Sequence, residues 1–183
     1  MPNDNTNIIP PQTFLGLVDA KEDGLEGFVR GYEIQANVPF HMFAEALDGF
    51  GIVASAALYD GSLDDGTNVP GLSEENYQST VYYERGGFQA RVSWTKRDRF
   101  QTEVRGLSLA LVETFDQGAE LIDAQIGYDF GLGGFERLDG LYISLQGQNL
   151  TDEDTLQTND DVREVTQFQS FGANYILNVN YKF

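Results

Sequence analysis

The chain contains no cysteine, few basic residues and no long hydrophobic run, and each of these absences excludes a class of protein. Without cysteine there is no disulfide framework, no thiolate metal site and no cysteine nucleophile. The 11 Lys and Arg residues stand against 29 Asp and Glu residues, and the formal net charge of -18 opposes binding to nucleic acid, which is itself a polyanion. No apolar run approaches the length of about 18 residues that indicates a transmembrane helix.

The sequence is also poor in features of secretion signals and enzymes. Residues 1–7 have neither the positive n-region nor the apolar h-region of a secretory signal. His41 is the only histidine, so a Ser-His-Asp triad would require it, and nothing in its neighbourhood supports one. No carboxylate spacing indicates a catalytic pair. We therefore expect neither an enzyme nor a cofactor.

What the chain does contain is alternation of apolar and polar residues, together with 20 glycines and nine tyrosines, a composition typical of turns and pleated strands. The alternation predicts an all-β fold, an antiparallel meander of about seven to eight strands. A weaker apolar patch at 13–18 is either the eighth strand or part of a loop. The seven clear segments are 31–40, 52–58, 76–84, 88–95, 122–130, 141–148 and 174–183.

The connections between these segments alternate in length. Residues 85–87 and 131–140 are a tight and a modest connection, whereas 63–75, 100–118 and 151–172 are long, polar and acidic. Short turns at one end of the strands and long loops at the other are typical of transmembrane β-barrels.

The alternate apolar residues form one face, which something must cover. In a soluble sandwich a second sheet covers such a face, and in a transmembrane barrel lipid does, with aromatic residues near the strand ends at the water interface. Both interpretations stay open at this point. Aromatic residues toward the strand ends are Tyr32, Tyr77, Tyr83, Phe88, Trp94, Tyr128, Phe130, Tyr175, Tyr181 and Phe183.

The end of the chain resembles the ending of TonB-dependent outer-membrane receptors. Its last segment has Tyr175, Leu177, Val179, Tyr181 and Phe183 at every second position, which is similar to the terminal strand that outer-membrane barrels present to their insertion machinery. Upstream, GQNLTD at 147–152 and FGANY at 171–175 resemble the family's NLTD and GR-Y motifs, with Ala173 where the family usually has arginine.

A second stretch extends this resemblance to residues 27–183. VPGLS at 69–73, NY at 76–77 and YYERGGFQARVSW at 82–94 are similar to a proteobacterial subgroup of these receptors that is often linked to carbohydrate uptake, and GFVRGYE at 27–33 fits the strand before it. The resemblance implies that 27–183 is the C-terminal part of a barrel of about 22 strands. Residues 1–26 would then be an extracellular loop or partial strand.

From this resemblance we expect a truncated reading frame or a split gene whose intact parent lies in the outer membrane. The parent would actively import a scarce ligand, a carbohydrate or a siderophore-like molecule. The implied partners are outer-membrane lipid, the barrel-assembly machinery through the C-terminal strand, and the plug and N-terminal strands that this chain lacks. TonB would be contacted only through that absent part. The alternatives are a soluble all-β carbohydrate-binding module and a small complete barrel of eight strands.

Candidate ligand-binding residues follow from the face opposite to the apolar one. Glu33, Arg91, Asp123 and Asp129 are predicted to face the lumen, where they would bind a polar ligand or pair with one another. The loop 60–66 carries three aspartates, but it lacks the spacing and the closing glutamate of a calcium loop, so a solvated acidic loop is favoured over a metal site. The sequence Asn149-Leu150-Thr151 matches a glycosylation pattern only by chance.

Overall fold

The computed structural model describes residues 26–102, 113–159 and 164–183. Within these residues the protein is all-β, its strands pair in antiparallel sheets, and no α-helix is present. The all-β, antiparallel class predicted from the alternation is therefore confirmed. The weak apolar patch at 13–18, and with it nearly all of the segment 1–26, lies outside the described residues.

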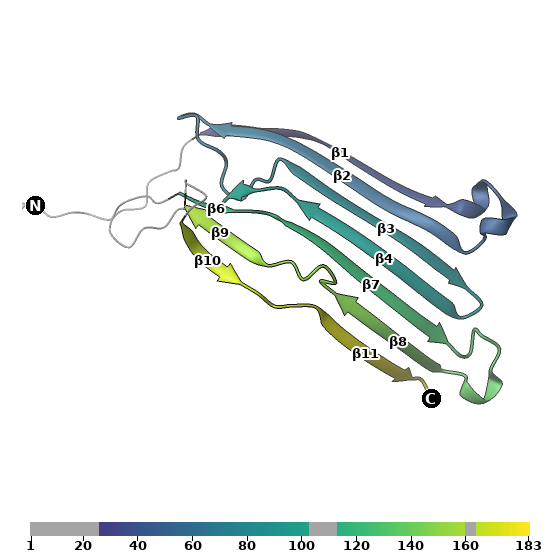
Figure 1. The fold of residues 1–183 in the computed structure, drawn as a ribbon. Helices are drawn as coiled ribbons and strands as arrows, with labels where there is room; N and C mark the ends of the chain where they lie inside the picture. Colours follow the sequence, from purple (N-terminus) through teal and green to yellow (C-terminus); the bar gives the residue numbers. More distant parts are fainter. Residues whose placement is uncertain (1–25, 103–112, 160–163) are drawn as a thin grey trace, which may run out of the picture.

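Seven long strands form the main sheet, in the order β1-β2-β3-β4-β7-β8-β11 (Figure 1). Each strand pairs with its neighbour in antiparallel fashion, and among the described residues the edge strands β1 and β11 do not pair with each other, so the sheet is open. The strands are β1 Gly27–Pro39, β2 Phe50–Leu63, β3 Glu75–Arg85, β4 Phe88–Arg97, β7 Ala119–Asp129, β8 Leu141–Gln148 and β11 Asn174–Tyr181.

The pairing register places the apolar positions of neighbouring strands opposite one another. Val38 pairs with Ile52, Ile52 with Val81, Val81 with Val92, and Val92 with Ala124. Because side chains alternate between the two faces of a strand, this register brings all the alternate apolar sets onto one face of the sheet.

A second sheet of four short strands, in the order β10-β9-β6-β5, was not expected from the sequence. Its strands are β5 Phe100–Gln101, β6 Thr114–Asp116, β9 Thr155–Asn159 and β10 Val165–Gln169. They lie in 100–118 and 151–172, so the prediction that these two segments are only loops was wrong. Strands of two to five residues carry too little alternation to be recognised, and the pairing of β6 with β9 joins segments far apart in the sequence.

The connections lie at two ends of the main sheet (Figure 1). One end, the turn end, carries residues 40–49, the pair Gly86-Gly87 and residues 130–140. The connection between β1 and β2 contains the 3-10 turns Phe40–Met42 and Glu45–Leu47. The other end, the loop end, carries 64–74 and the described parts of 98–118 and 149–173.

The described residues contain no hydrophobic core. None of their hydrophobic side chains is buried, and the buried polar residues are Ser73, Gln101, Ser144 and Thr158. Hydrophobic side chains such as Ile34 and Leu177, exposed by 71% and 67%, lie on an uncovered sheet face. The sheet is thus held by its backbone ladder and by contacts within each face, not by a second layer.

The hairpin between β3 and β4 turns at two glycines whose substitution should have unequal effects. Gly86 and Gly87 have φ of 58° and 82°, as in a type I′ turn, but a Cβ at Gly87 would lie 2.2 Å from the carbonyl oxygen of Asp129, whereas nothing lies within 4 Å at Gly86. Gly86→Ala should cost about 1–2 kcal/mol for its left-handed backbone. Gly87→Ala should cost about 1–3 kcal/mol more because its methyl group meets rigid backbone. Urea unfolding followed by circular dichroism compares the two variants, and equal midpoints would contradict the structure.

Candidate functional site

The first candidate site is the exposed face that carries the alternate apolar residues, called the apolar face below. Between the strand ends it holds no charged side chain, and its only hydroxyl groups belong to Ser79 and to tyrosines. Monomeric soluble proteins rarely expose an apolar patch of more than a few hundred Å². Its members are Tyr32, Ile34, Ala36, Val38, Phe50, Ile52, Ala54, Ala56, Leu58, Tyr77, Ser79, Val81, Tyr83, Phe88, Ala90, Val92, Trp94, Ile122, Ala124, Ile126, Tyr128, Leu141, Ile143, Leu145, Gly147, Tyr175, Leu177, Val179 and Tyr181.

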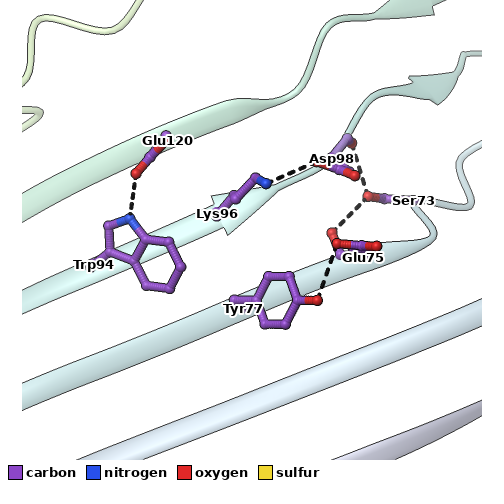
Figure 2. A network of polar contacts seen from close by, with 7 residues as sticks. All are labelled: Ser73, Glu75, Tyr77, Trp94, Lys96, Asp98 and Glu120. Carbon is purple, nitrogen blue, oxygen red and sulfur yellow. Dashed lines mark hydrogen bonds and ion pairs between the residues drawn. The ribbon is translucent and has the colours of Figure 1, made fainter.

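At the loop end, the apolar face stops at two aromatic residues whose polar atoms bond to carboxylates (Figure 2). The Tyr77 hydroxyl donates to Glu75 Oε2 at 3.1 Å, and Trp94 Nε1 donates to Glu120 Oε1 at 2.8 Å. The two rings stack with centroids 6.4 Å apart. An aromatic ring with its body on apolar surface and its polar atom turned toward charge is typical of a boundary between apolar and aqueous surroundings.

The same network extends into the loops (Figure 2). Lys96 Nζ lies 3.4 Å from Asp98 Oδ1, and the buried Ser73 hydroxyl donates to the carbonyl oxygens of Asp98 at 2.9 Å and Glu75 at 3.3 Å. Ser73 therefore ties the loop before β3 to the end of β4.

Ion pairs also lie at the limits of the apolar face on β1, β2 and β3. At the loop end, Arg30 Nη2 lies 2.6 Å from Asp60 Oδ2. At the turn end, Arg85 Nε lies 3.9 Å from Asp48 Oδ2. The charge-free surface is thus bounded by charge at both ends.

Aromatic rings collect along the turn end of the apolar face. Ring centroids are 4.4 Å apart for Phe50 and Tyr83, and 5.9 Å apart for Tyr83 and Phe88. Farther along the same end, Tyr128 contacts Phe130 at 5.0 Å, and Tyr181 contacts Phe183 at 4.9 Å. The aromatic residues near the strand ends therefore form a row that crosses the sheet.

The opposite surface, called the polar face, carries all four predicted ligand-binding residues but does not bring them together. In the strand registers Arg91 lies opposite Gln125, Asp123 opposite Ser93, and Asp129 opposite Tyr142. Glu33 is distant on β1 and accepts a hydrogen bond from the Tyr59 hydroxyl. Among the described residues, no carboxylate lies within ion-pair distance of Arg91.

The two aspartates of this set have local structural partners. Asp129 Oδ1 accepts the backbone N–H of Leu132 at 3.0 Å, and so orders the turn after β7. Asp123 Oδ1 accepts the backbone N–H of Asn149 at 2.8 Å. Both carboxylates are therefore engaged in shaping the sheet ends.

Asn149 begins the NLTD motif, and its side chain explains that motif in structural terms. Its φ of 51° is left-handed, which asparagine tolerates better than most residues. Asn149 Oδ1 accepts the N–H of Glu153 at 2.8 Å, and Nδ2 donates to the Glu153 carbonyl at 2.9 Å. Thr151 Oγ1 reaches the carbonyl of Glu120 on β7 at 3.2 Å. The motif fastens the end of β8 to β7 and to its own loop.

Neighbouring residues engage two of the three carboxylates of the acidic loop 60–66. Asp60 pairs with Arg30, and Asp65 Oδ1 accepts the Thr67 hydroxyl at 2.6 Å and the Thr67 N–H at 2.9 Å. These two bonds lower the pKa of the Asp65 carboxyl below its usual value. In the described part of the chain, no three His, Asp or Glu side chains gather as metal ligands.

Sequence reasoning missed a feature of the polar face, the placing of tyrosines over glycines. A Cβ at Gly51 would lie 2.3 Å from Tyr82 Cζ, and one at Gly31 would lie 2.4 Å from Tyr59 Cδ1. Each tyrosine lies on the strand next to the glycine, an arrangement that shields backbone that glycine leaves bare. The signal in the sequence is a glycine within an alternating segment.

The predicted barrel-insertion residues lie on the edge strand β11. Tyr175, Leu177, Val179 and Tyr181 are exposed by 49–67% on the apolar face, and Phe183 follows the strand. Along one edge β11 pairs with β8, from Asn174 opposite Gln148 to Tyr181 opposite Leu141. The alternation of this segment therefore corresponds to an observed β-strand.

Comparison of the chain with protein-family models, with curated proteins and with solved structures finds no significant match. No described helix is long and apolar enough to cross a membrane.

Proposed function

We propose that the chain is a segment of a transmembrane β-barrel of the outer membrane, with lipid against its apolar face. The observation that carries this proposal is an exposed sheet face without charge, bounded by aromatic rings and ion pairs at both ends. Burying such a face contributes roughly 1.5–3 kcal/mol for each large apolar side chain.

The arrangement of the second sheet favours lipid over a protein layer as the cover. In Figure 1, β6, β9 and β10 extend beyond the loop ends of β7, β8 and β11, and do not lie over the main sheet. A soluble sandwich would place its second sheet against the apolar face.

The dimensions of the apolar face fit a bilayer. Tyr77 and Tyr83 are six residues apart on β3, which corresponds to about 20 Å along the strand. The apolar band of outer-membrane barrels is about 25 Å tall, between aromatic girdles. Strands β3, β4 and β7 have 11, 10 and 11 residues, close to the about 9–11 that a tilted membrane strand needs.

The directions of the two edge strands limit which further strands could complete a barrel. The main sheet has seven antiparallel strands, so β1 and β11 run in the same direction. A further copy of the sheet in the same orientation across the membrane could join these edges only through a parallel pair at each seam. An all-antiparallel barrel therefore needs an odd number of additional strands, and unpaired edges are costly in lipid.

We assign those strands to a TonB-dependent receptor, whose C-terminal part the motifs of 69–94 and 147–183 resemble. In this proposal the intact receptor imports a scarce ligand, its remaining part supplies the plug and the contact with TonB, and Tyr175 to Phe183 address the barrel-assembly machinery. In this proposal the chain forms part of the barrel wall, and it catalyses no reaction.

The position of Trp94, the only tryptophan, tests the membrane proposal. The full chain is reconstituted into vesicles whose lipids carry bromine either near the headgroup or near the chain end. Because Trp94 lies at the aromatic boundary, the shallow bromine should quench its fluorescence more strongly. Moving the tryptophan inward, with Trp94→Phe and Val92→Trp together, should shift quenching toward the deep bromine, by about 7 Å of strand. Quenching of both proteins by aqueous iodide alone would reject the proposal.

Two neighbouring positions on β7 give a matched substitution test. Ile126 lies in the middle of the apolar face and Gln125 on the polar face. In vesicles, Ile126→Lys should destabilise the protein by about 2–4 kcal/mol, the cost of lysine at the bilayer midplane. Gln125→Lys should change stability much less because the lysine meets water. Urea unfolding in vesicles provides both values, and equal costs would argue against lipid on the apolar face.

The assignment to a receptor has its own test in the coding sequence. Continuation of the reading frame upstream of Met1 into further alternating strands, a plug and a signal peptide is the expected result. A stop codon and ribosome-binding site directly before Met1 would contradict the receptor assignment.

A further inference from the structure

A small cavity of about 160 Å³ lies at the loop end, between the loop 64–74 and the short second sheet. A water molecule takes up about 30 Å³ in the liquid, so the cavity has room for a compact organic molecule in place of a few waters. No residue of its lining was singled out from the sequence. The cavity is separate from the four residues Glu33, Arg91, Asp123 and Asp129.

The inner lining combines apolar side chains with one buried amide. Val69 and Leu72 line the cavity from the loop, and Phe115 and Gln101 line it from the second sheet. In the pairing of β5 with β6, Gln101 is opposite Phe115, so both side chains lie on the same face of that sheet.

Gln101 is exposed by only 5%, and its side-chain amide makes no hydrogen bond within the described part of the chain. Because buried polar groups in folded proteins normally have a hydrogen-bond partner, an amide of this kind on a cavity wall indicates a ligand that supplies one. An amide both donates and accepts hydrogen bonds, and a hydroxyl group can do the same.

The outer lining carries one cation and one anion. Arg99 and Glu74 are the charged residues of the lining, and both are exposed. They do not pair with each other, and among the described residues neither has another charged partner within ion-pair distance. The Arg99 guanidinium lies 4.0 Å from the centroid of the Phe115 ring. A guanidinium held on an aromatic ring keeps N–H groups available for a carboxylate.

The wall formed by the loop is fixed by hydrogen bonds. The N–H of Leu72 donates to the carbonyl of Val69 at 3.1 Å, which closes a turn. The N–H of Gly71 donates to the backbone carbonyl of Gln101 at 2.7 Å and joins the loop to the second sheet. Walls that are ordered before binding lose less conformational entropy when a ligand arrives.

We propose that this cavity binds a small zwitterion, a free α-amino acid with a short hydroxyl side chain. Its carboxylate meets Arg99, its ammonium group meets Glu74, and its hydroxyl group meets the amide of Gln101. One charge of each sign on the lining complements a zwitterion, whereas an ion of one sign would have a like charge beside it. The inference goes beyond the proposed function, because the cavity lies among the loops and its ligand need not be the molecule that the receptor imports.

Calorimetric titration of the full chain in detergent micelles tests the ligand class. L-serine or L-threonine should bind with saturation. L-valine has the shape of threonine with a methyl group for the hydroxyl group, and it should bind at least about tenfold more weakly than threonine because it leaves the Gln101 amide unpaired. The analogues 3-hydroxybutyrate and 1-amino-2-propanol lack the ammonium group and the carboxylate, and each should also bind at least about tenfold more weakly than threonine.

Two substitutions in the lining test the assigned contacts. Gln101→Leu should abolish the preference for threonine over valine, a change of specificity that misfolding would not produce. Arg99→Met should weaken threonine binding about tenfold or more, because the carboxylate loses its partner. Arg137→Met is the matched control, since Arg137 lies at the turn end, outside the cavity, and this variant should bind threonine like the wild type.

The outcomes separate this inference from the proposed function. Absence of binding to both serine and threonine, or equal binding of threonine and valine by the wild type, overturns the inference even if Trp94 reports a bilayer. Equal losses in Arg99→Met and Arg137→Met also overturn it. Saturable threonine binding together with iodide-only quenching of Trp94 retains the cavity site and rejects the membrane setting. Circular dichroism of each variant shows whether a loss of binding is a loss of folding, and the comparison of threonine with valine on the wild type decides without any variant.

Discussion

The register of the antiparallel ladder is the constraint on which the rest of this structure depends. No described hydrophobic side chain is buried, so no packed core fixes the strands relative to one another. A shift of one residue in any strand would turn its apolar set onto the polar face. The seven strands instead keep one phase from Val38 opposite Ile52 to Val179 opposite Ile143. This common register produces two different surfaces, one apolar and one polar.

The same register gives the two faces of the sheet their different character. On the apolar face it aligns Tyr77 beside Trp94 and places their carboxylate partners one row farther out. On the polar face it brings Ser55 and Gln78 into one row and leaves Ala57 as the low point of the next. An apolar surface and a polar surface are therefore the two sides of the same pairing.

At the loop end, side-chain contacts join the loops to the ends of the strands. The NLTD motif uses a left-handed asparagine, backbone bonds to Glu153 and the Asp123 carboxylate to close β8 against β7. Arg97 and Arg99, two of the few cations of an acidic chain, stack on Phe100 and Phe115 of the short second sheet. These contacts tie the loops to the strand ends from which they leave.

The amino-acid sequence by itself determined the seven long strands and their two faces, because a period of two is a local property that needs no knowledge of the fold. It also placed Glu33, Arg91, Asp123 and Asp129 on one face for the same reason. Only the tertiary structure decided that Asp123 serves Asn149, 26 residues away, and that segments near 115 and 158 pair as a second sheet. A groove on the polar face, lined by residues of β1 to β4, likewise needs four strands in register. Contacts between residues distant in the chain leave no periodic trace, so alternation alone does not reveal them.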